Sequence, residues 1–190
     1  MTSDVRILLI SGSTRGASTN TGALRAVNAI DHERITSVFY DRLRDLPAFN
    51  PDDDFDPLPS PVRDLRAQIA AADGVLFCTP EYAGGLPGSF KNLLDWTVGG
   101  SEMYRKPVTW ITVAPEGRGT HAEASLRTVL GYVGATIIEP AGTRVLVERA
   151  DLDPEGGVAS PEIRSRLHDV VRAFADGVRA TRSVPERRPT

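Results

Sequence analysis

The stretch that decides the fold is Ile7-Leu8-Leu9-Ile10-Ser11-Gly12-Ser13-Thr14-Arg15-Gly16-Ala17-Ser18-Thr19-Asn20-Thr21-Gly22-Ala23-Leu24. It opens as an unbroken apolar run, continues as a loop of Gly, Ser, Thr and one Arg, and ends in residues at helical spacing. An apolar run without polar alternation is typical of a strand covered on both faces in a parallel sheet. The stretch therefore predicts a strand, a loop and a helix. Open α/β sheets bind ligands at the carboxyl ends of such strands.

The loop in this stretch is suited to an anion. The first backbone N–H groups of a helix lack partners, and the helix dipole is positive at that end. Side-chain donors in the loop add to these amides: Ser13, Thr14, Ser18, Thr19, Asn20, Thr21 and the charged Arg15. The loop has no Lys and no Gly-x-Gly-x-x-Gly pattern, so it is neither a Walker loop nor a dinucleotide fingerprint. Such a cradle suits the terminal phosphate of a mononucleotide such as FMN, and a capped turn without a ligand is the alternative.

Composition narrows the class of protein. The 190 residues suffice for one domain with a full core, and the net charge of −3 gives no sign of binding to nucleic acid or to a membrane surface. Cys78 is the single cysteine, which favours a reducing compartment. No apolar run approaches the roughly 20 residues that a membrane span needs, and the first residues lack a signal-peptide pattern. We therefore expect a cytoplasmic protein.

Four further strand-and-helix units follow the first. The expected strands are residues 34–40, 75–79, 108–114 and an interrupted pair at 136–138 and 143–147, and the expected helices include a strongly amphipathic one from Pro161. The proline-rich run 45–61 predicts a surface connection. This alternation predicts an α/β fold, a flavodoxin-like doubly wound five-stranded parallel sheet in the order 2-1-3-4-5. We expect one domain over residues 1–180 and a disordered tail over residues 181–190.

In this order three loops lie along one rim of the sheet: the phosphate loop, the loop after Thr79 and the loop after Ala114. His32, His121 and His168 lack metal-ligand spacing, so we expect no metal site. Only His121, beside the third loop, is placed to touch a substrate. Cys78 is expected to be a small buried hydrophobe.

Two motifs on this rim resemble the NADPH-dependent FMN reductase family of flavodoxin-like proteins, which includes quinone, azo-dye and chromate reductases. Residues 12–20 match Gly-Ser-x-Arg-x-x-Ser-x-Asn, and residues 80–96 resemble Pro-Glu-Tyr-Asn-x-x-x-Pro-Gly-x-Leu-Lys-Asn-x-x-Asp-Trp. The likeness covers roughly residues 5–178. Members of this family bind FMN, take a hydride from NADPH and pass electrons to an acceptor, and they are commonly dimers or tetramers.

The resemblance implies which residues form the site. The phosphate of FMN would be held by Ser13, Thr14, Arg15, Ser18, Asn20 and Thr21, and the isoalloxazine ring would lie along Pro80, Glu81, Tyr82, Ala83 and Gly84, with Glu116 and Gly117 in the third loop. No catalytic side chain is expected, because the cofactor supplies the chemistry. Arg15 could instead face the 2′-phosphate of NADPH. The matching Lys91, Asn92, Asp95 and Trp96 are expected to serve packing or a subunit interface.

The chain also departs from the family pattern. Ala83 replaces the usual Asn, Phe90 replaces the usual Leu, and the third loop carries Pro115, Glu116 and Arg118 where relatives more often have small residues. The second and third loops would form the walls over the flavin, so these changes leave the choice between NADPH and NADH and the acceptor open.

We expect an FMN-dependent NAD(P)H oxidoreductase that reduces a small molecule such as a quinone, an azo dye, a metal oxyanion or free flavin. We also expect a homodimer or homotetramer, with Met103 and Tyr104 available for self-association. Two alternatives stay open. One is a flavin-binding electron carrier without NAD(P)H turnover, and the other is an interaction domain without flavin.

Overall fold

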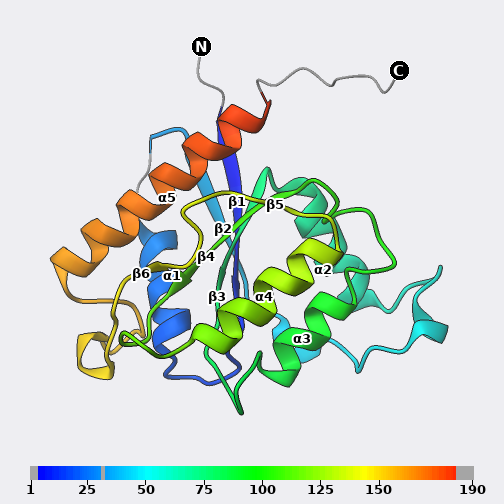
Figure 1. The fold of residues 1–190 in the computed structure, drawn as a ribbon, viewed down its shortest axis with the longest axis horizontal. Helices are drawn as coiled ribbons and strands as arrows, with labels where there is room; N and C mark the ends of the chain where they lie inside the picture. Colours follow the sequence, from blue (N-terminus) through cyan, green and yellow to red (C-terminus); the bar gives the residue numbers. More distant parts are fainter. Residues whose placement is uncertain (1–3, 31–32, 183–190) are drawn as a thin grey trace.

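The computed structural model describes residues 4–30 and 33–182 and is built around a parallel sheet (Figure 1). The strands are β1 (Val5–Ser11), β2 (Ile35–Tyr40), β3 (Gly74–Cys78), β4 (Pro107–Thr112) and β5 (Thr136–Ile137), in the order β2-β1-β3-β4-β5. A short β6 (Thr143–Arg144) pairs with the end of β4, while β5 pairs with its start. The predicted order is therefore confirmed, including the interruption in the last strand.

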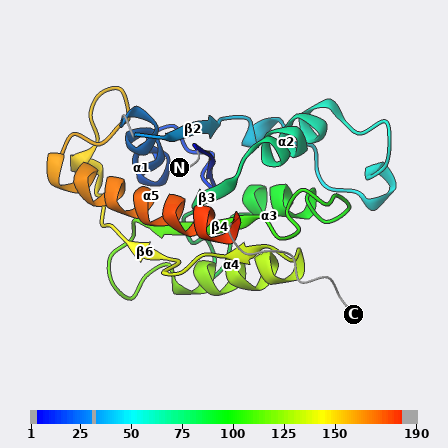
Figure 2. The same ribbon diagram turned by 90° about the horizontal axis from the view of Figure 1, so that it is seen from above.

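The helices cover both faces of the sheet. Figures 1 and 2 show α1 (Thr19–Ala29) and α5 (Pro161–Arg182) on one face, and α2 (Ser60–Ala71), α3 (Gly88–Asp95) and α4 (Thr120–Tyr132) on the other. Along β1, Ile7 and Leu9 belong to the core under α1 and α5, whereas Leu8 and Ile10 belong to the core under the other three helices. Each such side chain contributes about 1.5–3 kcal/mol when fully buried. The unbroken apolar run of β1 thus reflects burial on both faces.

The proline-rich connection between β2 and α2 runs over the surface and contains only the short turns η1 (Leu43–Asp45) and η2 (Pro51–Asp53). It is anchored by Arg66 of α2, whose side chain is 9% exposed. The Nη2 atom of Arg66 donates to Asp54 at 2.5 Å, and its Nε donates to the carbonyl of Trp96 at 2.9 Å. Trp96 is fully buried, and its indole N–H donates to the carbonyl of Pro47. Trp96 therefore serves packing within the chain.

Two expectations change in the structure. Met103 is 1% exposed and lies in the core, so it is not available for self-association, whereas Tyr104 is 68% exposed. The last helix, α5, continues to Arg182, so Thr181 and Arg182 are helical although we assigned them to the tail. Residues 183–190, like His32, lie outside the described residues.

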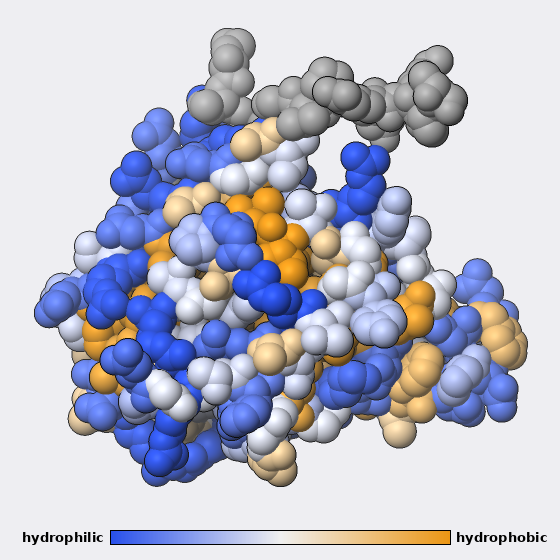
Figure 3. Space-filling model, in the orientation of Figure 1, coloured by the Kyte–Doolittle hydropathy of each residue, from blue (hydrophilic) through white to orange (hydrophobic). Residues whose placement is uncertain are grey.

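Most of the face shown in Figure 3 is hydrophilic. Blue residues predominate over α5, and the strongest hydrophobic colour gathers between α5 and α4. Among the described residues, no helix has the length and hydrophobicity to cross a membrane.

Candidate functional site

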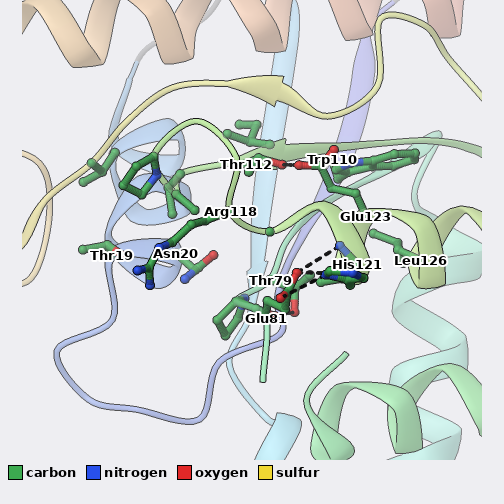
Figure 4. A pocket seen from close by; sticks show the side chains of 18 of the residues that line it. Thr19, Asn20, Thr79, Glu81, Trp110, Thr112, Arg118, His121, Glu123 and Leu126 are labelled. Carbon is green, nitrogen blue, oxygen red and sulfur yellow. Dashed lines mark hydrogen bonds and ion pairs between the residues drawn. The ribbon is translucent and has the colours of Figure 1, made fainter. Parts of the chain in front are cut away.

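The start of α1 and the two other rim loops surround a cavity of about 510 Å³, called the main cavity below (Figure 4). Its lining comes mainly from the start of α1, the β3–α3 loop, β4, the β4–α4 loop and the first turns of α4, and includes Thr19, Asn20, Thr79, Pro80, Glu81, Trp110, Thr112, Gly117, Arg118, His121 and Glu123. Cofactor pockets typically measure about 300–1,000 Å³. The cavity therefore lies where the strand order predicts a ligand site and is large enough for one.

The phosphate loop is held by short-range hydrogen bonds. The hydroxyls of Ser11 and Thr21 are 2.8 Å apart, and Ser11 Oγ also accepts the N–H of Ser13. Ser13 Oγ accepts the N–H of Arg15 at 3.3 Å, and Ser18 Oγ caps α1 by accepting the N–H of Thr21. A hydroxyl that accepts a bond still has one O–H to donate. The loop is thus shaped by its own side chains and keeps donors for an anion.

The predicted phosphate residues are divided between two cavities. Asn20 lines the main cavity, and Ser18 is the helix cap. Ser13, Thr14, Arg15 and Thr21 line a separate cavity of about 290 Å³ on the β2 side of the loop, together with Arg25 and Arg44. The loop therefore faces the smaller cavity and the start of α1 faces the main cavity, and sequence spacing alone could not show this division.

The predicted ring residues divide in the same way. Pro80, Glu81 and Gly117 line the main cavity, whereas Tyr82, Ala83, Gly84 and Glu116 do not. Tyr82 and Gly85 exchange two backbone hydrogen bonds of 3.0 Å across a tight turn. Within this turn Ala83 has φ 49° and Gly84 has φ 72°. Asn tolerates the left-handed region better than Ala does, so the departure at Ala83 falls where the family's usual Asn has a conformational reason.

Glu81 joins the β3–α3 loop to the start of α4. Its Oε2 accepts the backbone N–H groups of His121 at 3.0 Å and Ala122 at 3.3 Å, and His121 Nδ1 lies 3.5 Å from its Oε1 (Figure 4). Partial burial acts to raise the pKa of Glu81, but the two backbone bonds and the nearby His121 outweigh it, so the pKa is lowered. Glu81 is therefore an ionised strap between two walls of the main cavity.

Arg144 of β6 holds the β4–α4 loop through hydrogen bonds to its backbone. Its Nη1 donates to the carbonyl oxygens of Ala114 at 2.7 Å, Pro115 at 3.0 Å and Arg118 at 3.1 Å. Its Nη2 donates to Glu123 Oε1 at 3.2 Å, and the hydroxyl of Thr112 donates to the same oxygen. We call this set of contacts the Arg144 clasp. It fixes the loop that forms one wall of the main cavity.

Asn20 is positioned by the buried Cys78. The thiol donates to Asn20 Oδ1 at 3.3 Å, and burial raises the pKa of Cys78, so that the thiol keeps its proton. The amide nitrogen of Asn20 then faces the cavity, and in the described part of the chain it has no partner. The indole N–H of Trp110 also has no partner among the described residues, but it is buried next to Gly142, which does not line the cavity. Asn20 thus offers the cavity a donor for a polar atom of a ligand.

The sequence model of the NADPH-dependent FMN reductase family matches residues 5–144 of this chain. The chain belongs to this family. The match includes both rim motifs, all five strands of the ordered sheet and the loops that enclose the main cavity. The protein is therefore an oxidoreductase with FMN as its cofactor.

Relatives of this chain carry names that agree with the family. It is 32% identical to a probable NADPH:quinone oxidoreductase 2 of Oryza sativa subsp. japonica, covering 90% of this chain and 89% of the relative. It is 30% identical to a 2-hydroxy-1,4-benzoquinone reductase of a Burkholderia species, covering 94% and 98%. Among solved structures, FerB, a flavoenzyme NAD(P)H:(acceptor) oxidoreductase of Paracoccus denitrificans, is similar with a TM-score of 0.79 and 27% identity, covering 93% and 98%.

The side chains of the site fit a flavin nucleotide, because the unpaired amide of Asn20, the phosphate loop and a cavity of suitable size meet at one rim. Five residues that line or support the cavity carry no signal in the sequence: Thr79, Trp110, Thr112, Glu123 and Arg144. Arg118 stands out in the sequence only as a departure from the family pattern. Arg144 follows Arg118 by 26 residues, and no local pattern links the two.

Proposed function

We propose that the protein takes a hydride from NADPH or NADH and passes the electrons to a small-molecule acceptor such as a quinone, an azo dye, a metal oxyanion or free flavin. The observation that carries this proposal is the main cavity, which lies between the start of α1 and the two other rim loops and holds the unpaired amide of Asn20. Bound FMN supplies the redox chemistry, by accepting two electrons from the nicotinamide and releasing them to the acceptor. Two relatives named for quinone reduction support a quinone among the acceptors.

Within this proposal the protein binds, orients and shields the flavin. Ser13, Thr14, Arg15, Ser18, Asn20 and Thr21 would hold the phosphate, and Pro80, Glu81, Tyr82, Ala83, Gly84, Glu116 and Gly117 would flank the ring. Glu81 and the Arg144 clasp keep the two wall loops in place. A fixed wall holds the reacting groups in register and limits the access of water, which favours hydride transfer over side reactions.

The decisive test is the absorbance spectrum of the purified, FMN-loaded protein before and after anaerobic addition of NADPH. A reductase loses its flavin absorbance rapidly and regains it when a quinone is added. A protein that binds FMN but is bleached only by dithionite would be an electron carrier. A protein that takes up no FMN would be the interaction domain of the third alternative.

A second test examines the phosphate loop by comparing FMN with riboflavin. Charge-assisted hydrogen bonds contribute about 1.5–3 kcal/mol each, so loss of two or more should weaken riboflavin on the order of a hundredfold relative to FMN. Ser13→Ala and Arg15→Ala should weaken FMN and leave riboflavin almost unchanged. If Arg15→Ala spares FMN and raises only the KM for NADPH, Arg15 faces the nicotinamide nucleotide.

We also propose self-association and a cytoplasmic location. Tyr104 is 68% exposed and Tyr132 is 89% exposed, so both of these large aromatic side chains are uncovered in the single chain. Aromatic side chains are enriched in subunit interfaces. Sedimentation of the wild type at micromolar concentration should give a dimer or tetramer, and a monomer would contradict the proposal. The single, buried Cys78 is compatible with a reducing compartment.

A further inference from the structure

We infer that Arg118 is a phosphate-binding residue of the main cavity, working with Asn20 from the opposite wall. This inference rests on the proposed function and adds a cation that the family pattern does not contain. The ligand chemistry is a phosphate group, either that of FMN or one of the phosphates of the nicotinamide nucleotide.

The first observation is the placement of Arg118. Its side chain lines the main cavity together with Thr19 and Asn20, and Figure 4 shows it extending from the β4–α4 loop toward these two residues at the start of α1. The start of α1 has unpaired N–H groups and a positive dipole, so a further cation there has no protein group to attract it. An anion between the two walls would interact favourably with both the N-terminus of α1 and the guanidinium of Arg118.

The second observation is Asn20, a side chain that is 7% exposed yet keeps a free donor in the cavity. Its oxygen is occupied by the Cys78 thiol, so its amide nitrogen is the group left for a ligand. Asn20 Nδ2 and the guanidinium of Arg118 are both donors and cannot bond to each other. They can share the oxygens of one phosphate, which accepts several hydrogen bonds at once.

The third observation is that the carboxylates of the cavity are already engaged. Glu81 accepts two backbone N–H groups of α4, and Glu123 accepts from Thr112 and Arg144. Within residues 4–30 and 33–182, the guanidinium of Arg118 has no carboxylate partner. Its charge is therefore available to a ligand.

The backbone of Arg118 is fixed, although its guanidinium has no partner among the described residues. The N–H of Arg118 donates to the carbonyl of Pro115, and its own carbonyl accepts from Arg144 at 3.1 Å. The flanking Gly117 and Gly119 have φ values of 77° and 86°, which a residue with a Cβ rarely adopts. A pinned backbone reduces the entropy lost when the side chain binds an anion.

The test measures dissociation constants of apoprotein for FMN and riboflavin by flavin fluorescence, and of the FMN-loaded protein for NADP⁺ by calorimetry. The variants are Arg118→Gln, Arg118→Lys and the control Arg63→Gln, which removes one charge from the exposed face of α2. Loss of one charge-assisted bond to phosphate should weaken binding about tenfold, and Arg118→Lys should restore part of it.

Each outcome decides the matter. A tenfold loss confined to FMN, with riboflavin unchanged, assigns Arg118 to the FMN phosphate, and a loss confined to NADP⁺ assigns it to the nicotinamide nucleotide. The inference is overturned if neither ligand weakens, if riboflavin weakens as much as FMN, or if Arg63→Gln has the same effect. Bleaching of the wild-type flavin by NADPH, measured in parallel, tests the proposed function separately, because it does not depend on Arg118.

Discussion

The β1–α1 loop and the β4–α4 loop lie on the same rim of the sheet but are held in different ways. In the β1–α1 loop, the side-chain hydrogen bonds join residues two to ten positions apart, as between Ser13 and Ser11 or between Ser11 and Thr21. In the β4–α4 loop and the helix that follows it, the bonds reach 21 to 41 positions, to Arg144 on one side and Glu81 on the other. The first loop is therefore shaped by local sequence, and the second by charged residues from distant parts of the chain.

The largest expected effect comes from closing the space beneath the β1–α1 loop with Gly12→Ala. A Cβ at Gly12 would clash with Thr79 Oγ1 and lie 2.9 Å from the ring of Phe90, which is fully buried. Thr79 is β-branched and stiff, so the strain should cost about 3 kcal/mol of unfolding free energy, at the upper end for overpacking. Denaturant unfolding measures this, with Gly16→Ala as the control, since a Cβ there meets nothing within 4 Å. Equal stability of the two variants would show that the loop is not packed as described.

The second largest effect is expected from removing Arg144, which supports the β4–α4 loop from a distant part of the chain. Arg144→Gln removes the clasp and leaves the carboxylate of Glu123, whose side chain is 27% exposed, without its cation. We expect a loss of about 2 kcal/mol, because hydrogen bonds to charged groups contribute about 1.5–3 kcal/mol. The control Lys91→Gln breaks an exposed ion pair to Asp95 within one helix and should cost less than about 1 kcal/mol. If the clasp fixes this wall of the main cavity, Arg144→Gln should also raise the KM for NADPH. Lys91→Gln should leave that KM unchanged.

A smaller effect separates stability from binding in the β1–α1 loop. Ser18→Ala and Ser160→Ala each remove a helix N-cap, one at α1 in the site and the other at α5 outside it. Each should cost about 1 kcal/mol of unfolding free energy. Only Ser18→Ala should also weaken FMN, as measured by fluorescence titration. If both variants bind FMN equally well, Ser18 acts as a cap and makes no contact with the phosphate.

The smallest effect concerns the Glu81 strap and disappears in acid. Because the pKa of Glu81 is lowered in the folded protein, its carboxylate contributes stability above its unfolded pKa and loses that contribution as the pH falls through the folded value. The difference in thermal midpoint between wild type and Glu81→Gln should therefore be present at pH 7 and shrink below about pH 4.5. Other carboxylates titrate in both proteins and cancel. A difference that stays constant down to pH 3 would contradict the ionised strap.

The sequence by itself predicted the sheet order, the loop between β1 and α1 and the family, because the strand-and-helix alternation, the Ser and Thr residues of the loop and the two motifs are patterns of residues close together in the chain. The run from Ile7 to Ile10 signals burial on both faces, and Ser18 caps the helix that it begins. Only the tertiary structure decided that Asn20 and Arg15 face different cavities, and that Arg118 and Asn20 share one. It also brought Arg144 to the loop that precedes α4. The physical reason is that spacing encodes local geometry, whereas contacts between loops depend on how the parallel sheet aligns the carboxyl ends of strands that are distant in sequence.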